Sequence, residues 1–134
     1  MTSTRTIFLA SAATALGLFA ANASAEAAPT CANGPIQIGA VSTVTGVSDF
    51  SDAPKATGAV FKQLNDAGGI HGCKIEFTLA DDKGDPQVAA QAARDLIDNK
   101  GVVALTGGAS LLDCAVTAAT YSRNDVMAVQ GVGV

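Results

Sequence analysis

Short apolar runs alternate along residues 26–134 with stretches in which apolar residues recur every three or four positions. The short runs are rich in branched side chains and are bounded by glycine or polar residues, as expected of buried strands. They predict strands at 35–41, 74–79 and 102–106, and a fourth strand that begins at 126. The recurring stretches predict helices at 55–67, from 85 to the "NKG" at 99–101, and at about 111–123.

The first two predicted helices carry clear start and stop signals. In the first, Ala56, Val60, Leu64 and Ala67 form one apolar face, Ser51 or Asp52 is the expected cap, and "GG" at 68–69 ends the helix. In the second, Asp85 is the expected cap before a first-turn proline. Two adjacent apolar rows follow it, at 88, 92 and 96 and at 89, 93 and 97.

The alternation of strands and helices predicts the fold class. Strands without strict polar alternation, each followed by a helix, indicate an α/β fold with a parallel, doubly wound sheet and helices on both faces. Right-handed crossovers favour the strand order 2-1-3-4. The fourth strand would then lie at an edge. A valine-rich edge without partner or charged guard is not expected in a complete sheet, so we expect the chain to be a fragment.

Residues 1–25 have the zones of a cleavable secretory signal peptide. Arg5 precedes an uncharged apolar stretch, and "ASA" at 23–25 is a small-residue cleavage pattern that makes Glu26 the first mature residue. The residues before Cys31 do not form a lipoprotein box, which favours a soluble exported protein. Residues 26–134 hold seven basic and twelve acidic residues, a formal charge of −5. This charge argues against binding to nucleic acid.

The residue types along the chain argue against an enzyme. Ligands of doubly wound sheets bind at the carboxyl ends of the strands. The only histidine, His71, falls on a turn at the opposite edge. No phosphate-binding glycine motif is present. We therefore expect no catalytic residue, and no cofactor.

The acidic cluster Asp81, Asp82 and Asp85 lacks the spacing of a calcium loop, and Asp85 is already explained as a helix cap. We interpret the cluster as a solvated loop in preference to a metal site.

The loops after the first and third strands are the best candidates for a binding site. The first offers hydroxyl groups, among them Thr45, and the third offers Gly107 and Gly108, which let a ligand approach the backbone. Ser110 adds a hydroxyl at the start of the third helix, whose dipole favours a carboxylate. Such loops are suited to binding a small zwitterion. The alternative is that Ser110 only caps its helix.

The segments "IQIGAVSTVTG", "LNDAGGIHGCKIEFTLADDKGDPQVAAQAARDLI", "VVALTGG" and "VMAVQG" resemble the first lobe of the type I periplasmic binding proteins of the Leu/Ile/Val-binding class, which are ABC transporter substrate-binding proteins. The resemblance implies a two-lobed periplasmic receptor that closes on its ligand by hinge bending. It also implies delivery of the ligand to an ABC transporter permease in the inner membrane. The expected ligand is a small molecule, namely a branched-chain or related amino acid, an amide or a small organic acid.

The resemblance also assigns ligand-binding residues. It places Gly108, Ala109 and Ser110 at the ligand carboxylate and Gly131 and Val132 at its ammonium group, whereas the first-loop residues help to cover the ligand; these are Thr45 and Phe50. Two departures from the family pattern are "LL" at 111–112, where a hydroxyl residue is common, and "QG" at 130–131, where Ser-Pro is usual. Both leave the identity of the ligand open.

Three cysteines in an exported chain indicate one disulfide and one remaining thiol. Cys31 precedes the first strand and Cys73 begins the second, and neighbouring parallel strands start at the same edge, so these two are the expected pair. Cys114 would be left over. A second possible function uses the same lobe as the ligand-sensing domain of a signalling or regulatory protein.

Overall fold

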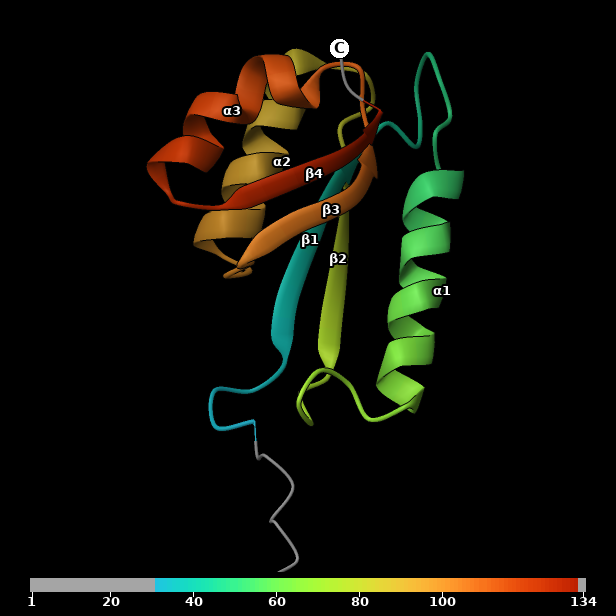
Figure 1. Cartoon of the computed structure of the whole chain (residues 1–134). Helices are drawn as coiled ribbons and strands as arrows, with labels where there is room; N and C mark the ends of the chain where they lie inside the picture. The colour runs from blue at the N-terminus through green and yellow to red at the C-terminus, as the bar shows by residue number, and fades with distance from the viewer. Residues whose placement is uncertain (1–30, 133–134) are drawn as a thin grey trace, which may run out of the picture.

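The computed structural model describes residues 31–132, which form one sheet and three helices. All four strands are parallel and their order is β2-β1-β3-β4, which confirms the predicted fold class and winding (Figure 1). The elements in chain order are β1 (Ile36–Ser42), α1 (Asp52–Asp66), β2 (Ile75–Asp81), α2 (Pro86–Asp98), β3 (Ala104–Ala109), α3 (Asp113–Arg123) and β4 (Met127–Val132). The predicted signal peptide lies outside the described residues.

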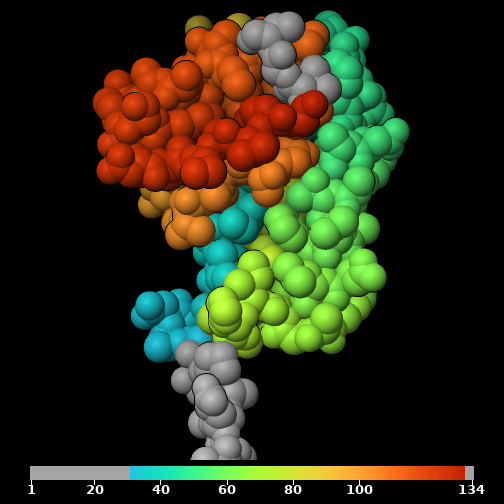
Figure 2. All heavy atoms as spheres, in the orientation of Figure 1, coloured from blue at the N-terminus to red at the C-terminus, as the bar shows by residue number. Residues whose placement is uncertain are grey.

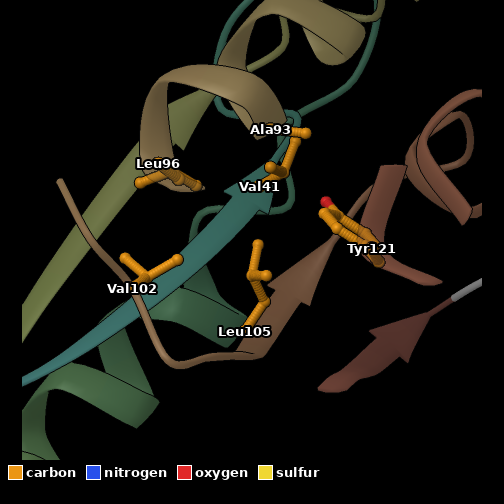
Figure 3. Packing of buried hydrophobic residues seen from close by; sticks show 6 residues of the cluster. All are labelled: Val41, Ala93, Leu96, Val102, Leu105 and Tyr121. Atoms are coloured by element: carbon orange, nitrogen blue, oxygen red, sulfur yellow. The ribbon is translucent and has the colours of Figure 1, made fainter. Parts of the chain in front are cut away.

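The helices cover both faces of the sheet, as the sequence predicts. α1 packs on β2 and β3 from one face, whereas α2 and α3 pack together on the other (Figure 1). The main core lies under α2 and α3, where Leu96 and Leu105 belong to one cluster of buried side chains (Figure 3). The residues of this core cluster are Val41, Ala93, Leu96, Val102, Leu105 and Tyr121.

α2 contacts the sheet through the two apolar rows that the sequence predicts. Ala89, Ala93 and Leu96 are buried. At Gly39 in β1, an added Cβ would lie 3.2 Å from both Leu96 and Val102, so the missing side chain lets α2 approach the sheet closely. Asp85 caps the helix as predicted, because its carboxylate accepts hydrogen bonds from the backbone N–H groups of Gln87 and Val88.

The predicted apolar face of α1 does not face the sheet. Val60 is 59% exposed and Leu64 is 36% exposed, and Ala56 and Ala67 are exposed as well. The opposite side of the helix packs instead. There Phe61 meets Phe77 edge to face at 5.4 Å between ring centroids. The apolar face that the spacing predicts is therefore not the buried one, because apolar spacing does not take account of Gly58, where the bare backbone leaves room for the Phe77 ring.

Two features lie at the amino edge of the sheet, away from the strand ends that usually bind ligands. Cys31 and Cys73 form a disulfide with a Cα–Cα distance of 5.1 Å, which confirms the predicted pair, and Cys114 is a free, exposed thiol. His71 is exposed in the turn between α1 and β2. Within residues 31–132, no helix has the length and apolar character needed to cross a membrane.

The fourth strand forms an open edge of the sheet. Met127 is 71% exposed and Val129 is 57% exposed. Figure 2 shows β4 in red, uncovered on the face toward the viewer. The sequence predicts this position at the edge.

Candidate functional site

The carboxyl ends of β1, β2 and β3 bring three loops together, at residues 43–51, 82–85 and 110–112. Backbone hydrogen bonds join these loops directly. The N–H of Thr43 donates to the carbonyl of Ala109 at 3.0 Å, and the N–H of Asp82 donates to the carbonyl of Ser42 at 3.1 Å. The loops after the first and third strands, which the sequence singles out, therefore lie at the same edge.

Asp82 is the buried centre of this loop cluster. The hydroxyl of Thr43 donates to its carboxylate at 2.7 Å, the N–H of Gly84 donates at 2.9 Å, and the hydroxyl of Ser110 donates to the second carboxylate oxygen. Every partner is a donor, as a carboxylate requires. The interpretation of the acidic cluster as a solvated loop was wrong for Asp82, because this side chain ties three loops together.

Asp81, its neighbour, fixes the first loop from the outside. The N–H groups of Val44 at 2.9 Å and Lys83 at 3.0 Å donate to its carboxylate, as do the N–H and the hydroxyl of Thr45. Burial alone would raise the pKa of Asp81, but these hydrogen bonds outweigh it and lower the pKa to about 2. The hydroxyl of Thr45 thus donates its hydrogen bond to a carboxylate of the protein itself.

Ser110 caps α3, although the helix begins three residues later, at Asp113. Its hydroxyl oxygen accepts hydrogen bonds from the N–H groups of Leu112 and Asp113, both at 3.1 Å. The same hydroxyl donates a hydrogen bond to the carboxylate of Asp82. One donor and two acceptor positions are the full capacity of a hydroxyl. The geometry supports the capping alternative. Contact between Ser110 and a ligand stays a prediction.

Ala109 and Gly108 are also enclosed by the protein. The N–H of Ala109 donates to the hydroxyl of Ser42 at 3.2 Å, and its carbonyl accepts that same hydroxyl at 2.9 Å. A side chain at Gly108 would collide with the carbonyl of Val41. In β4, Val132 is in register with Ala109, and Gly131 is exposed. The structure thus brings the two predicted ligand-binding segments, 108–110 and 131–132, onto neighbouring strands.

A second buried carboxylate, Asp113, lies at the start of α3. The hydroxyls of Thr117 and Tyr121 donate to it at 2.8 and 2.7 Å, and the amide nitrogen of Gln130 donates to its other oxygen. Burial raises the pKa of Asp113, and the charge of Asp82 raises it further, against the lowering effect of these hydrogen bonds. Burial also raises the pKa of Tyr121. Three members of this cluster stand four residues apart on one face of α3, but the spacing alone does not show that this face is buried or that Gln130 of β4 joins it.

A small hollow opens at the same edge between the first loop and the start of α3. Its volume is about 120 Å³. We call it the edge hollow; its lining residues are Thr43, Val47, Ser48, Phe50, Gly84, Leu111 and Leu112. Of the predicted site residues, only Phe50 lines it. The two leucines, which depart from the family pattern, face it together with Phe50.

The described residues 31–132 include no cluster of three or more histidine, cysteine, aspartate or glutamate side chains able to hold a metal ion. The hydrogen bonds of Asp81, Asp82 and Asp85 account for all three acids of the cluster through contacts to the protein itself. His71 lies at the opposite edge from these loops. The arrangement offers surfaces and hydrogen bonds for binding.

Comparison with known proteins gives one family match and several similar folds. The model of a family described as periplasmic binding protein matches residues 35–134. No curated protein matches the chain in sequence.

Three solved structures illustrate the similar folds. The branched-chain amino acid transporter substrate-binding protein LivJ from Streptococcus pneumoniae, solved with isoleucine, is 25% identical with a TM-score of 0.65. A type 1 periplasmic binding protein from Bordetella pertussis is 29% identical with a TM-score of 0.65. A fatty acid ABC transporter substrate-binding protein from Thermomonospora curvata is 20% identical, also with a TM-score of 0.65, and shares the fold.

These matches cover most of the chain but a small part of each neighbour. The comparison with LivJ covers 75% of this chain and 29% of LivJ. The corresponding shares are 74% and 27% for the Bordetella protein, and 74% and 25% for the Thermomonospora protein. The chain therefore spans less than a third of the length of these neighbours.

Proposed function

Because the chain belongs to the periplasmic binding protein family, we propose that the carboxyl edge of its sheet is one wall of the ligand site of a solute-binding receptor. The family consists of substrate-binding proteins of transporters and not of enzymes. The receptor is proposed to bind a branched-chain or related amino acid, an amide or a small organic acid. It is proposed to act in the periplasm after removal of residues 1–25 and to deliver the ligand to an ABC transporter permease.

The observation that carries this proposal is the convergence of three loops at one edge of a sheet that matches the fold of LivJ, which was solved with isoleucine. Ligands of open α/β sheets bind outside the carboxyl ends of the strands, where the strand order reverses. In the order β2-β1-β3-β4, this reversal lies between β1 and β3. The loops after these two strands, at 43–51 and 110–112, border the proposed site.

The residues proposed to contact or cover the ligand come from the loops after β1 and β3 and from the ends of β3 and β4. Phe50 is the best supported of them, since it lines the edge hollow. The exposed Gly131 leaves its backbone accessible from β4. The full proposed set is Thr45, Phe50, Gly108, Ala109, Ser110, Gly131 and Val132. Ala109 and Ser110, being buried, are proposed to act by holding the loops in place unless a ligand displaces their present partners.

A thermal-shift screen of the full-length protein tests the proposed function. The compounds are amino acids, their amides, urea, small aromatic acids and fatty acids. A ligand that binds only the folded state at 100 times its Kd adds about 2.7 kcal/mol to the free energy of unfolding. We expect one chemical class to raise the melting temperature. We also expect Phe50→Ala to reduce that rise, whereas the matched change Leu64→Ala on the exposed side of α1 leaves it unchanged. Equal rises in both variants would count against the site, and no rise with any compound would count against the function.

A further inference from the structure

We infer that Asp113 of α3 and Gln130 of β4 form a proton-dependent contact. A protonated Asp113 donates a hydrogen bond to the side-chain oxygen of Gln130, whereas the ionised form accepts one from the side-chain nitrogen, so the amide of Gln130 turns over when the proton leaves. The inference is independent of the proposed function, because the contact joins two elements of the fold and needs no ligand. Three observations support it.

The first observation is the supply of protons to the buried carboxylate of Asp113. The hydroxyl of Tyr121 donates to Oδ1 at 2.7 Å. The hydroxyl of Thr117 lies 2.8 Å from the same oxygen, but it also lies 2.6 Å from the backbone carbonyl of Asp113. A threonine hydroxyl has a single proton, so these two acceptors share it. The charged form of Asp113 is therefore less well compensated by hydrogen bonds than its contacts suggest.

The second observation is a buried acceptor without a partner beside the same carboxyl group. The amide nitrogen of Gln130 donates to the second oxygen of Asp113, and Oε1 of Gln130 is then buried with no hydrogen-bond partner among residues 31–132. Such an acceptor costs free energy. A side chain at Gly108 would meet both this Oε1 and the carbonyl of Val41. The turned-over amide directs its nitrogen toward that carbonyl and its oxygen toward Asp113, which can bond to it only when protonated.

The third observation is the charge around Asp113. The titratable groups that face it are Tyr121 on its own helix and Asp82 from the loop after β2, and Asp82 is buried as well. Cys114, the next residue, is exposed. The residues that α2 buries are apolar, and the charged residues of α2 are exposed; these are Arg94, Asp95 and Asp98.

The ion pairs of residues 31–132 both lie on α1, so neither neutralises Asp113. Burial raises the pKa of Asp113, and the nearby charge of Asp82 raises it further. The surroundings thus favour the protonated form that Gln130 can accept from.

The contact lies where the backbone pairing of β4 is irregular. Gln130 is in register with Gly108, and the register between β3 and β4 shifts on both sides of Gly108. Such irregularities interrupt the ladder of backbone hydrogen bonds. The side-chain contact to α3 therefore helps to position the end of β4, and we expect the orientation of the Gln130 amide to change with pH.

An NMR titration of the full-length protein tests the contact directly. The carboxyl carbon of Asp113 and the side-chain amide signals of Gln130 are followed as the pH is raised. We expect Asp113 to titrate above the ordinary aspartate pKa of about 3.9, and the amide signals of Gln130 to shift with the same midpoint. In Asp113→Asn, that shift of the Gln130 signals is expected to disappear. The inference is overturned if Asp113 titrates at or below the ordinary value, or if the Gln130 signals do not follow it.

The pH dependence of unfolding gives a second readout. An acid with a raised pKa holds its proton more tightly in the folded state, so the folding constant falls by up to about tenfold per pH unit between the unfolded and folded pKa values. Asp113→Asn keeps an acceptor for the hydroxyls and a donor for Oε1 of Gln130, but it has no proton to lose.

Urea unfolding of the full-length protein between about pH 4 and pH 8 measures the ratio of the folding constants of variant and wild type. We expect this ratio to rise with pH for Asp113→Asn and to stay level for the matched change Asp98→Asn on the exposed side of α2. A ratio for Asp113→Asn that falls as the pH rises would show that the folded protein uses Asp113 as a charge, and would overturn the inference.

Discussion

Replacement of Asp82 by alanine is expected to lower the free energy of unfolding by about 3 to 5 kcal/mol. The carboxylate accepts hydrogen bonds from Thr43, Gly84 and Ser110, which belong to three different loops. A hydrogen bond to a charged group contributes about 1.5 to 3 kcal/mol, and the donors left behind are buried or half-buried. The hydroxyls of Thr43 and Ser110 can rotate to other acceptors, but the N–H of Gly84 cannot, so the sum falls below three full bonds.

Urea unfolding of purified variants measures this loss. Asp98→Ala is the matched control, because Asp98 is exposed in the last turn of α2, and its change is expected to stay within about 0.5 kcal/mol. Asp82→Asn keeps one acceptor oxygen, so its free energy of unfolding should lie between those of Asp82→Ala and Asp98→Ala. If Asp82→Ala and Asp98→Ala are equally stable, Asp82 does not hold the loops together.

Loss of the disulfide is expected to cost about 4 kcal/mol. Cys31 and Cys73 are 42 residues apart in sequence, and closing a loop of this length removes conformational entropy from the unfolded chain. The bond ties the segment before β1 to the residues just before β2. The effect is large relative to the 5 to 15 kcal/mol by which domains are usually stable.

Chemical unfolding with and without a reductant separates this effect from others. Reduction should lower the stability of the wild type by about as much as Cys73→Ser does, and should leave the stability of Cys73→Ser unchanged. Cys114→Ser is the control, since Cys114 is a free thiol on the surface of α3. A reductant that has no effect on the wild type would show that the two cysteines are not joined in solution.

The arrangement of strands and helices was accessible from the sequence because it depends on local signals. Each strand is a compact apolar run, and α2 has both a cap at Asp85 and two apolar rows, from which Ala89, Ala93 and Leu96 are buried. The strand order then follows from the handedness of crossovers, a rule that needs no side-chain detail. The pairing of Cys31 with Cys73 follows in turn from that order.

The role of Asp82 was not accessible in the same way, although one signal pointed to it. Asp81 and Asp82 are adjacent and chemically identical, but successive residues of an extended strand point to opposite faces. Ser42 is in register with Asp81, so the next residues, Thr43 and Asp82, also lie side by side. If this strand register had been known, it would have placed the hydroxyl of Thr43 beside the carboxylate of Asp82. A one-dimensional pattern does not provide the register.

The buried face of α1 and the saturation of Ser110 needed the three-dimensional structure. Two sides of α1 carry apolar residues, and the choice between them depends on the fit of Phe61 to a ring on β2. The partners of Ser110 lie 28 residues away at Asp82 and, at the start of α3, at Leu112 and Asp113. From the sequence, the hydroxyl of Ser110 could either be available to a ligand or cap the third helix. Only its contacts in the structure distinguish these two roles.

Hydrogen exchange of backbone amides tests most directly the central claim that the ligand binds at the carboxyl edge of the sheet. The full-length protein is compared with and without the compound that raises its melting temperature most. We predict slower exchange at 43–50 and 110–112 in the complex and unchanged exchange in the turn at 68–73, next to the disulfide. Slower exchange at 68–73, with none at the carboxyl-edge loops, would contradict this account of the site.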